Sequence, residues 1–219
     1  MKNKLERYLQ NKQNNYIIEE GKYIYDKLKG NWNKIFKNNN PIFLELACGN
    51  GEYTINNSIK FQNNNYIGID IKGSRLWKGG QKLKEIKSKN AFFLRIQIEN
   101  ILDFFNNNEV SEILITFPDP RPRKRDIKKR LTSQNFISKY YKVLKNNGKL
   151  KLKTDDTILF KFSNQIINES KFSYLKKTNN LYKSKKFESI KEIKTKYENI
   201  FLKKGKNIKY LECKKLILN

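Results

Sequence analysis

The sequence contains no histidine. This absence excludes Ser-His-Asp and Cys-His nucleophilic sites, histidine general bases and HExxH zinc centres. Cysteine is scarce as well, because Cys48 and Cys213 are the only two and lie far apart along the chain. Two such cysteines suggest neither a metal cage nor a disulfide framework. We therefore expect a reducing compartment and no bound metal.

Long apolar runs are missing too. No stretch approaches the length that spans a bilayer, and the start Met1-Lys2-Asn3-Lys4 lacks the apolar core of a signal peptide. These absences predict a cytoplasmic protein that makes no contact with a membrane.

Acidic residues are few compared with basic ones. The chain has 47 lysines and arginines against 21 aspartates and glutamates, a formal net charge of +26. This excess predicts a polyanionic partner, nucleic acid first, since neutralising phosphates releases counterions and supplies affinity. An AT-rich genome would also spread lysine over any surface. Such a bias explains less well why seven of the eleven residues in 121–131 are basic and why four of those seven are arginine.

Apolar, β-rich segments alternate with segments of 3.6-residue periodicity. The expected strands are 42–47, 66–71, 92–96, 112–117 and 149–153, and the expected helices are 52–61, 76–87, 133–144 and 158–167. This alternation predicts an α/β fold with a doubly wound, mostly parallel sheet. Residues 1–40 are basic and precede the first strand, so we expect an N-terminal extension before a domain of residues 41–219. The extension is either an RNA-facing arm or a helical appendage.

A glycine turn follows the first expected strand. Gly49 and Gly51 let the backbone turn tightly and approach a ligand closely. Asp70 ends the second expected strand, where a carboxylate can accept hydrogen bonds from ribose hydroxyls. The third glycine of a dinucleotide fingerprint is absent, and Glu45 and Glu52 would repel a pyrophosphate. The loop suits a cationic or aminoacyl ligand such as S-adenosylmethionine, and a plain strand-to-helix turn is the alternative.

Several short segments together resemble the bacterial tRNA (guanine-N7-)-methyltransferase family, in order and in spacing, from about residue 40 onward. They are 44–51, 68–70, 90–94, 117–120, the basic run to 131, 153–155 and 195–198. The most specific combination is the turn Phe117-Pro118-Asp119-Pro120 with its trailing basic run and a late T-x-x-E. The resemblance implies a class I, Rossmann-like methyltransferase domain. It also implies methyl transfer from S-adenosylmethionine to N7 of a guanosine in the tRNA variable loop.

The resemblance implies a role for particular residues. The catalytic position falls on Asp119, and the cofactor positions fall on Glu45, Gly49, Gly51, Asp70, Gln97 and Asp119. Substrate contacts fall on Arg123, Asp155, Thr195, Lys196, Tyr197 and Glu198. The RNA-contacting run covers Arg125, Asp126, Ile127, Lys128, Lys129 and Arg130. The expected partner is tRNA, no metal is implied, and both a monomer and a homodimer remain open.

The chain departs from the family pattern at four positions. Gln97 replaces a common aspartate and can still bond an adenine edge, so we expect altered affinity. Ala47 replaces the first glycine and costs little if its backbone is not left-handed. Arg121 replaces an aromatic residue and Asp126 a histidine, which changes base stacking and RNA contacts but leaves the carboxylates in place.

N7 of guanine presents a lone pair and carries no proton, so its methylation needs no general base, in keeping with the missing histidine. Positioning should dominate the chemistry. Asp119 either stabilises the positive charge that reaches the purine or binds the guanine amino edge. Alternatively it is a turn carboxylate, which Asp-Pro favours, and Glu198 is a helix-face partner of Lys194.

Two rival functions remain open. One is another nucleic-acid methyltransferase, such as one that modifies exocyclic amino groups; those enzymes place a D/N-P-P-aromatic turn where this chain has Asp119-Pro120-Arg121. The other is a non-catalytic RNA-binding protein that keeps the fold.

Overall fold

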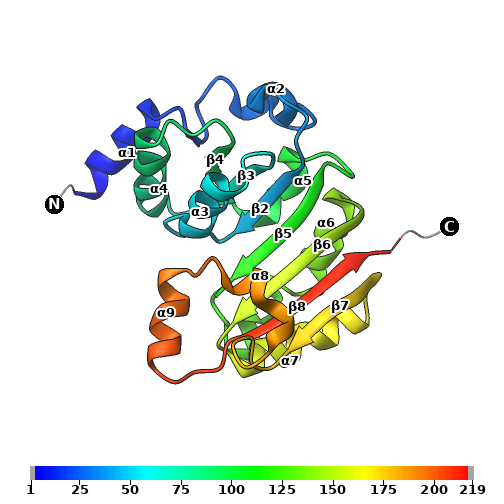
Figure 1. The fold of residues 1–219 in the computed structure, drawn as a ribbon. Coiled ribbons are helices and arrows are strands. Elements are labelled where there is room, and N and C mark those ends of the chain that lie inside the picture. The colour runs from blue at the N-terminus through cyan, green and yellow to red at the C-terminus, as the bar shows by residue number, and fades with distance from the viewer. Residues whose placement is uncertain (1–2, 217–219) are drawn as a thin grey trace.

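The computed structural model describes residues 3–216, and the strands in this range form one sheet (Figure 1). They are β1 Ile17–Ile18, β2 Ile42–Leu46, β3 Asn65–Ile69, β4 Ala91–Leu94, β5 Val110–Thr116, β6 Leu144–Thr154, β7 Phe172–Thr178 and β8 Lys209–Lys215. Their order across the sheet is β1-β4-β3-β2-β5-β6-β8-β7. Strands β1 to β6 pair in parallel, while β8 runs antiparallel to both β6 and β7.

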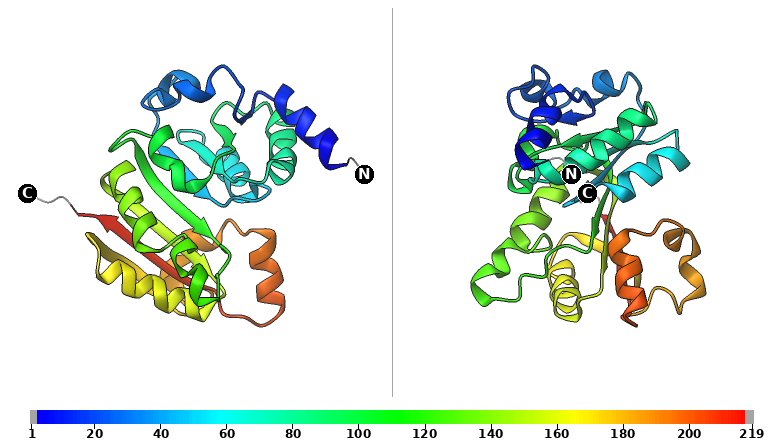
Figure 2. Two further views of the ribbon diagram at one scale, coloured as in Figure 1. Left: turned by 180° about the vertical axis from the view of Figure 1, so that it is seen from behind. Right: turned by 90° about the vertical axis from the view of Figure 1, so that its left-hand side faces the viewer.

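Helices connect these strands along the chain. They are α1 Lys4–Gln13, α2 Trp32–Phe36, α3 Glu52–Lys60, α4 Gly73–Glu85, α5 Ile101–Phe104, α6 Gln134–Val143, α7 Thr157–Asn168, α8 Glu188–Lys191 and α9 Lys196–Lys203. Figure 2 shows α6 and α7 against one face of the sheet, and Figure 1 shows α8 in front of the other face. The predicted doubly wound, mostly parallel α/β fold is confirmed, and all five expected strands and all four expected helices are present.

The central strands bury both faces because their side chains alternate. Along β2, Leu44 and Leu46 pack in the core shared with α5, α6 and α7, while Phe43 packs on the opposite side against the core of α3 and α4. Along β4, Leu94 joins the first core and Phe93 the second. A parallel strand covered on both faces reads as a continuous apolar run, which is why sequence periodicity located these strands.

The N-terminal segment packs on the sheet. Trp32 is fully buried, and its indole Nε1 donates to the carbonyl of Phe104 at 2.9 Å. Strand β1 extends the sheet beyond β4. On α1, Asn11 donates its side-chain amide to the carbonyl of Gly73 at 2.8 Å. These contacts join residues before 41 to the rest of the sheet and its helices through strand pairing, buried aromatic packing and a side-chain hydrogen bond.

Strands β7 and β8 were not expected from the sequence. Two of the seven residues of β7 and three of the seven residues of β8 are lysine. Strand β8 lies between β6 and β7 and is nonetheless largely buried. Residues 179–208 form an insertion between β7 and β8 that carries α8 and α9 (Figure 1). Within the described residues, no helix combines the length and the apolarity that a membrane crossing requires.

Candidate active site

A cleft of about 710 Å³ opens where the carboxyl ends of β2 and β5 meet α9. A second pocket of about 370 Å³ adjoins it near the end of β3. Ala47 and Asp119 line both spaces. In open α/β sheets, ligands bind outside the carboxyl ends of the strands, where neighbouring crossovers run to opposite faces. Here that position is between β2 and β5, which are neighbours in the sheet.

The glycine turn after β2 is braced by Asp70. The Gly49 amide donates to Asp70 Oδ2 at 2.9 Å, and the Lys72 amide donates to Oδ1 at 2.8 Å. The Asp70 side chain lines the second pocket. Since a carboxylate has about four lone-pair sites, Asp70 can brace the turn and still accept hydrogen bonds from a ligand.

Three residues of this turn have a left-handed backbone. The φ angles are 59° at Gly49, 73° at Gly51 and 54° at Ala47. The expectation that Ala47 costs little depended on a backbone that is not left-handed, and the structure does not meet that condition. A non-glycine residue in this region costs roughly 1–2 kcal/mol, because its Cβ crowds the following carbonyl.

Gly51 is required by packing as well as by its φ angle. A Cβ at this position would lie 2.1 Å from the ring of Phe93 on β4. Gly51 does not line the cleft or the second pocket, whereas Gly49 lines the cleft. The absence of a side chain at Gly51 thus lets β4 pack under the turn.

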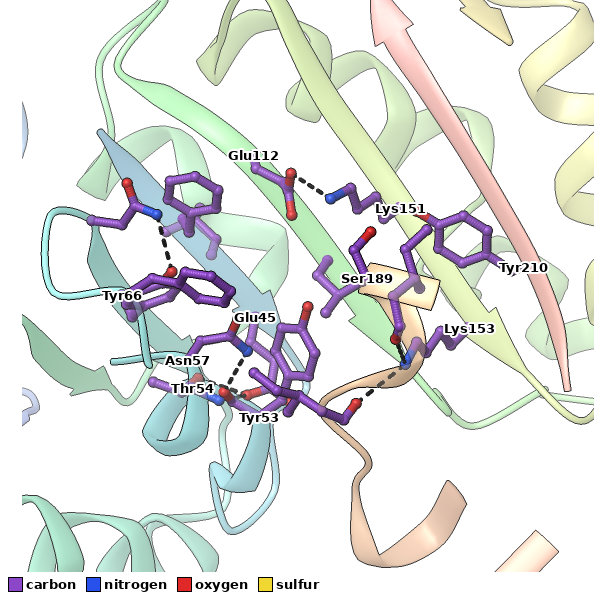
Figure 3. A pocket seen from close by; sticks show the side chains of 17 residues that line it. Glu45, Tyr53, Thr54, Asn57, Tyr66, Glu112, Lys151, Lys153, Ser189 and Tyr210 are labelled. Carbon is purple, nitrogen blue, oxygen red and sulfur yellow. Dashed lines mark hydrogen bonds and ion pairs between the residues drawn. The ribbon is translucent and has the colours of Figure 1, made fainter. Parts of the chain in front are cut away.

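Glu45 on β2 is buried and accepts hydrogen bonds from three groups. Thr54 donates to Glu45 Oε2 from its amide at 2.9 Å and its hydroxyl at 2.6 Å, and the Thr116 hydroxyl donates to Oε1 at 3.1 Å. Burial raises the pKa of Glu45 to about 7, although these hydrogen bonds oppose the shift. The carboxylate therefore ties β2 to α3 and β5 at the floor of the cleft. Figure 3 shows its bonds to Thr54 beside a third pocket of about 240 Å³.

The turn after β5 presents Asp119 to both spaces. Its side chain is 62 % exposed, whereas Pro118 before it is buried. The amide of Arg121 donates to Asp119 Oδ1 at 3.1 Å, and the guanidinium Nε of Arg121 lies 3.3 Å from Oδ2. Arg121, which stands where the resemblance implies an aromatic residue, is therefore the ion-pair partner of the expected catalytic carboxylate.

Helix α9 carries the T-x-x-E motif and forms the far wall of the cleft. Thr195 caps this helix by accepting a hydrogen bond from the amide of Glu198 at 3.1 Å. The amide of Lys196 donates to Glu52 Oε2 at 2.6 Å and docks α9 on α3. Tyr197 is 56 % exposed, and its ring lies 6.5 Å from that of Phe201, which lies 5.5 Å from that of Phe117. These rings form an aromatic row along the cleft.

Glu198 is fully buried and does not line the cleft. Its carboxylate accepts from Lys153 Nζ at 3.2 Å and from the Tyr182 hydroxyl at 2.8 Å. The alternative that Glu198 pairs with Lys194 on an exposed helix face is wrong, because the ammonium of Lys194 lies over the ring of Tyr182 and Glu198 points inward.

Two further expected site residues, Asp155 and Gln97, lie on different walls. Asp155 lines the cleft and forms an ion pair with Lys206. Gln97 is exposed and lines the second pocket beside Asp70. Lys129 lines that pocket too. The spaces at the sheet edge thus bring together residues from most of the segments on which the family resemblance rested.

The basic run folds into a 3-10 turn, η3 Lys124–Lys129, beside the second pocket. Arg123, Arg125 and Lys128 are exposed, Ile127 is half-buried, and Asp126 pairs with Lys129 at 3.1 Å. Neither the cleft nor the second pocket is lined by these residues, apart from Lys129.

Arg130 differs from the rest of the run because it is only 4 % exposed. Its guanidinium donates to the carbonyls of Pro120 and Arg121, on the turn that carries Asp119. In this structure Arg130 therefore does not present its charge to solvent as an RNA contact would.

Sequence reasoning missed several residues that shape the site. Thr116, the last residue of β5, and Lys153, the last but one of β6, were not assigned a role, although both lie in expected strands. Phe201 lies one helical turn after Tyr197, a spacing that puts both on one helix face. No group of three or more cysteine, aspartate or glutamate side chains in residues 3–216 is arranged to hold a metal ion.

Comparisons with known proteins place the chain in a family. A family model described as a putative methyltransferase matches residues 39–211. The tRNA (guanine-N(7)-)-methyltransferase of Cytophaga hutchinsonii is 38 % identical over 211 residues, which are 95 % of this chain and 96 % of that protein. The enzyme of the same name from Christiangramia forsetii is 40 % identical over 97 % of this chain and 98 % of its own length.

Solved structures support the fold. A 16S rRNA methyltransferase, KamB, superposes with a TM-score of 0.67 at 11 % identity, over 86 % of this chain and 94 % of that one. An antibiotic-related methyltransferase gives 0.62 at 18 % identity over the same shares. At such identities the similarity concerns the fold, and the assignment rests on the sequence relatives. The chain belongs to the tRNA (guanine-N(7)-)-methyltransferase family.

Proposed function

We propose that this chain transfers a methyl group from S-adenosylmethionine to N7 of a guanosine in the tRNA variable loop. One observation supports it above the others: the Asp119 carboxylate is exposed at the junction of the cleft and the second pocket. A group in that place can contact a cofactor in one space and a base in the other. Location in the cytoplasm remains a prediction.

The second pocket fits the nucleoside part of the cofactor. Asp70 would accept hydrogen bonds from the ribose hydroxyls and Gln97 would bond the adenine edge, between apolar walls that include Ile71 and Ile98. At Gly49 the space toward the cleft is open, since a Cβ built there meets no atom within 4 Å. When bound, the cofactor supplies an electrophilic methyl group on a cationic sulfur. The carboxylates of Glu52 and Asp155 on the cleft walls suit the positive charges of its sulfonium and ammonium groups.

The aromatic row along the cleft is suited to a purine. The exposed ring of Tyr197 and the neighbouring ring of Phe201 offer stacking surfaces, and base–aromatic stacking contributes about 1–3 kcal/mol per base. Asp119 would then stabilise the charge that develops on the purine or accept hydrogen bonds from the guanine amino edge. Neither role needs a proton to be removed from N7, so the site can operate without histidine.

The exposed part of the basic run would contact the RNA backbone. Arg123, Arg125 and Lys128 project from a segment whose last residues adjoin the second pocket. Phosphate contacts of this kind position the substrate and carry no sequence information. Selection of the guanosine therefore falls to the cleft, where Asp119 and Tyr197 lie.

The decisive experiment is incubation of the chain with unmodified tRNA and methyl-labelled S-adenosylmethionine, followed by nucleoside analysis. We expect labelled 7-methylguanosine. A different labelled nucleoside would indicate another RNA methyltransferase. If the protein binds tRNA but transfers no label to it, the chain is a non-catalytic RNA-binding protein.

A further inference from the structure

Arg130 is the only member of the basic run 121–131 that is buried. Burial of a guanidinium is costly unless its donors are satisfied. Here Nε donates to the carbonyl of Pro120 at 3.0 Å, and Nη2 donates to the carbonyl of Arg121 at 3.1 Å. The guanidinium carbon also lies 4.6 Å from the centre of the Phe162 ring on α7. The charge is thus enclosed between α7 and the turn that carries Asp119.

That turn needs restraint from outside itself. Phe117 and Arg121, which flank Pro118-Asp119-Pro120, have φ angles of 47° and 49°. Non-glycine residues rarely adopt this region, and they remain there only when the surrounding structure holds them. The chain also leaves β5 at this point, so the sheet ladder no longer constrains the backbone beyond Phe117.

The two ends of the turn are held in different ways. At the first end, the amide of Phe117 donates to the carbonyl of Lys153 on β6 at 2.8 Å. At the other end, Arg130 binds the carbonyls of Pro120 and Arg121. Proline has no amide hydrogen, so neither Pro118 nor Pro120 can hold the turn by donating a backbone hydrogen bond.

Arg121 connects Arg130 to Asp119. With its carbonyl held by Arg130, Arg121 directs its own amide and its guanidinium Nε to the two oxygens of the Asp119 carboxylate. We propose that Arg130 is a positioning residue, which fixes the Asp119 carboxylate at the junction of the cleft and the second pocket instead of contacting tRNA phosphates. This inference rests on the proposed function, because it assigns a role within the same site.

The test is Arg130→Lys, which keeps the charge but removes the planar fork that bridges two carbonyls. We expect the single-turnover methylation rate at saturating tRNA and cofactor to fall at least tenfold, since a misplacement of about 1 Å can reduce a rate on the order of 100-fold. The slope of log tRNA affinity against log salt should equal that of the wild type. Lys128→Ala, which removes an exposed charge of the same run, should instead flatten this slope by roughly 0.7 to 0.9.

A second variant separates positioning from loss of the fold. Phe162→Leu keeps Arg130 but removes the ring beneath its guanidinium, and we expect a smaller fall in rate with an unchanged salt slope. Added guanidinium ion at millimolar concentration should restore part of the rate to Arg130→Ala. A merely structural role would lower the melting temperature without rescue by the ion.

Two outcomes would overturn the inference: a wild-type rate in Arg130→Lys, or a salt slope flattened as in Lys128→Ala. Failure of the proposed function looks different, because the wild-type chain itself would then form no 7-methylguanosine. Lys176→Ala, an exposed lysine on β7 far along the chain, controls for net charge in both measurements.

Discussion

The ammonium nitrogen of Lys153 lies 3.2 Å from both carboxylate oxygens of Glu198. Both side chains are almost completely buried, at 1 % and 0 % exposure. The ammonium also donates to the carbonyls of Ile190 and Ile193. This pair joins the end of β6 to the insertion that carries α9, and so holds the wall of the cleft against the sheet.

Removing one partner of this pair should be costly. Glu198→Gln leaves the Lys153 ammonium buried without a counter-charge, and breaking such a pair typically costs about 3–5 kcal/mol of unfolding free energy. Burial already lowers the pKa of Lys153, and loss of Glu198 removes the charge that opposes this shift. Urea unfolding measures the loss. The double variant Lys153→Met/Glu198→Leu should recover much of it, and equal instability of the single and double variants would show that the pair is not what holds the insertion.

Stability should depend on pH through Glu45. Burial raises its pKa from an ordinary value of 4.5 to about 7, so between these values the folded state binds more protons than the unfolded state. The contribution of Glu45 to stability is therefore fully present below about pH 4.5 and is lost as the pH rises through about 7. Glu45→Gln removes this titration.

The wild type should consequently lose up to about 3 kcal/mol of unfolding free energy relative to Glu45→Gln across this window. Urea unfolding of both proteins at pH 5 and pH 8 measures the difference. The Gln oxygen can keep the two bonds from Thr54, and its amide can donate to the Thr116 hydroxyl. Parallel pH profiles for the two proteins would contradict the raised pKa.

Cofactor affinity should depend on Asp70. Asp70→Ala removes the proposed acceptor for the ribose hydroxyls together with the brace on Gly49, so S-adenosylmethionine binding should weaken by about 1.5–3 kcal/mol. Isothermal titration calorimetry measures the change, and NAD should not compete. Asp103→Ala on the exposed side of α5 is the matched control. Unchanged affinity in Asp70→Ala would remove this residue from the cofactor site.

Asp119→Asn should separate chemistry from binding. The amide keeps the shape of the carboxylate but lacks its charge, so the single-turnover methylation rate should fall far more than tRNA affinity does. Some loss of cofactor affinity is expected, because Asp119 also lines the second pocket. Rapid-quench measurement at saturating substrates gives the rate, with Asp103→Asn as control. A variant that methylates at the wild-type rate would exclude Asp119 from the mechanism.

The exposed basic run should set the salt dependence of tRNA binding. Replacing Arg123, Arg125 and Lys128 with alanine should flatten the slope of log affinity against log salt by up to about 2–3 units, at roughly 0.7–0.9 per phosphate contact. Cofactor affinity should stay the same. Arg130 is left unchanged because it is buried.

Lysines outside the run give the matched control for this experiment. The triple variant Lys171→Ala/Lys176→Ala/Lys183→Ala removes the same charge from exposed positions before, on and after β7. If the two triple variants lose equal affinity and equal slope, the run is a solvated face and tRNA follows another path.

Local sequence patterns were enough to predict the framework of this protein. Strands β2 to β5 are largely buried, so each appears as a mainly apolar run. The end of β6 instead alternates leucine with lysine, a pattern of period two that is also typical of a strand. The resemblance to the family implied that Glu45, Asp70 and Asp119 share one site, and in the structure Glu45 and Asp119 line the cleft while Asp70 and Asp119 line the second pocket. The family resemblance supplied the reaction, and the relatives confirm the family.

Tertiary structure alone decided the partners of the charged side chains. Arg130 has the same local sequence character as Arg125, yet packing against Phe162 buries one and leaves the other in solvent. Glu198 pairs with Lys153, 45 residues away, and not with nearby Lys194. A run of charged residues, or a glutamate on a helix face, has the same local sequence pattern whether its side chains lie in solvent or are buried in the protein. Only the positions of distant elements determine which environment it meets, because burial of a charge depends on partners that the neighbouring residues do not specify.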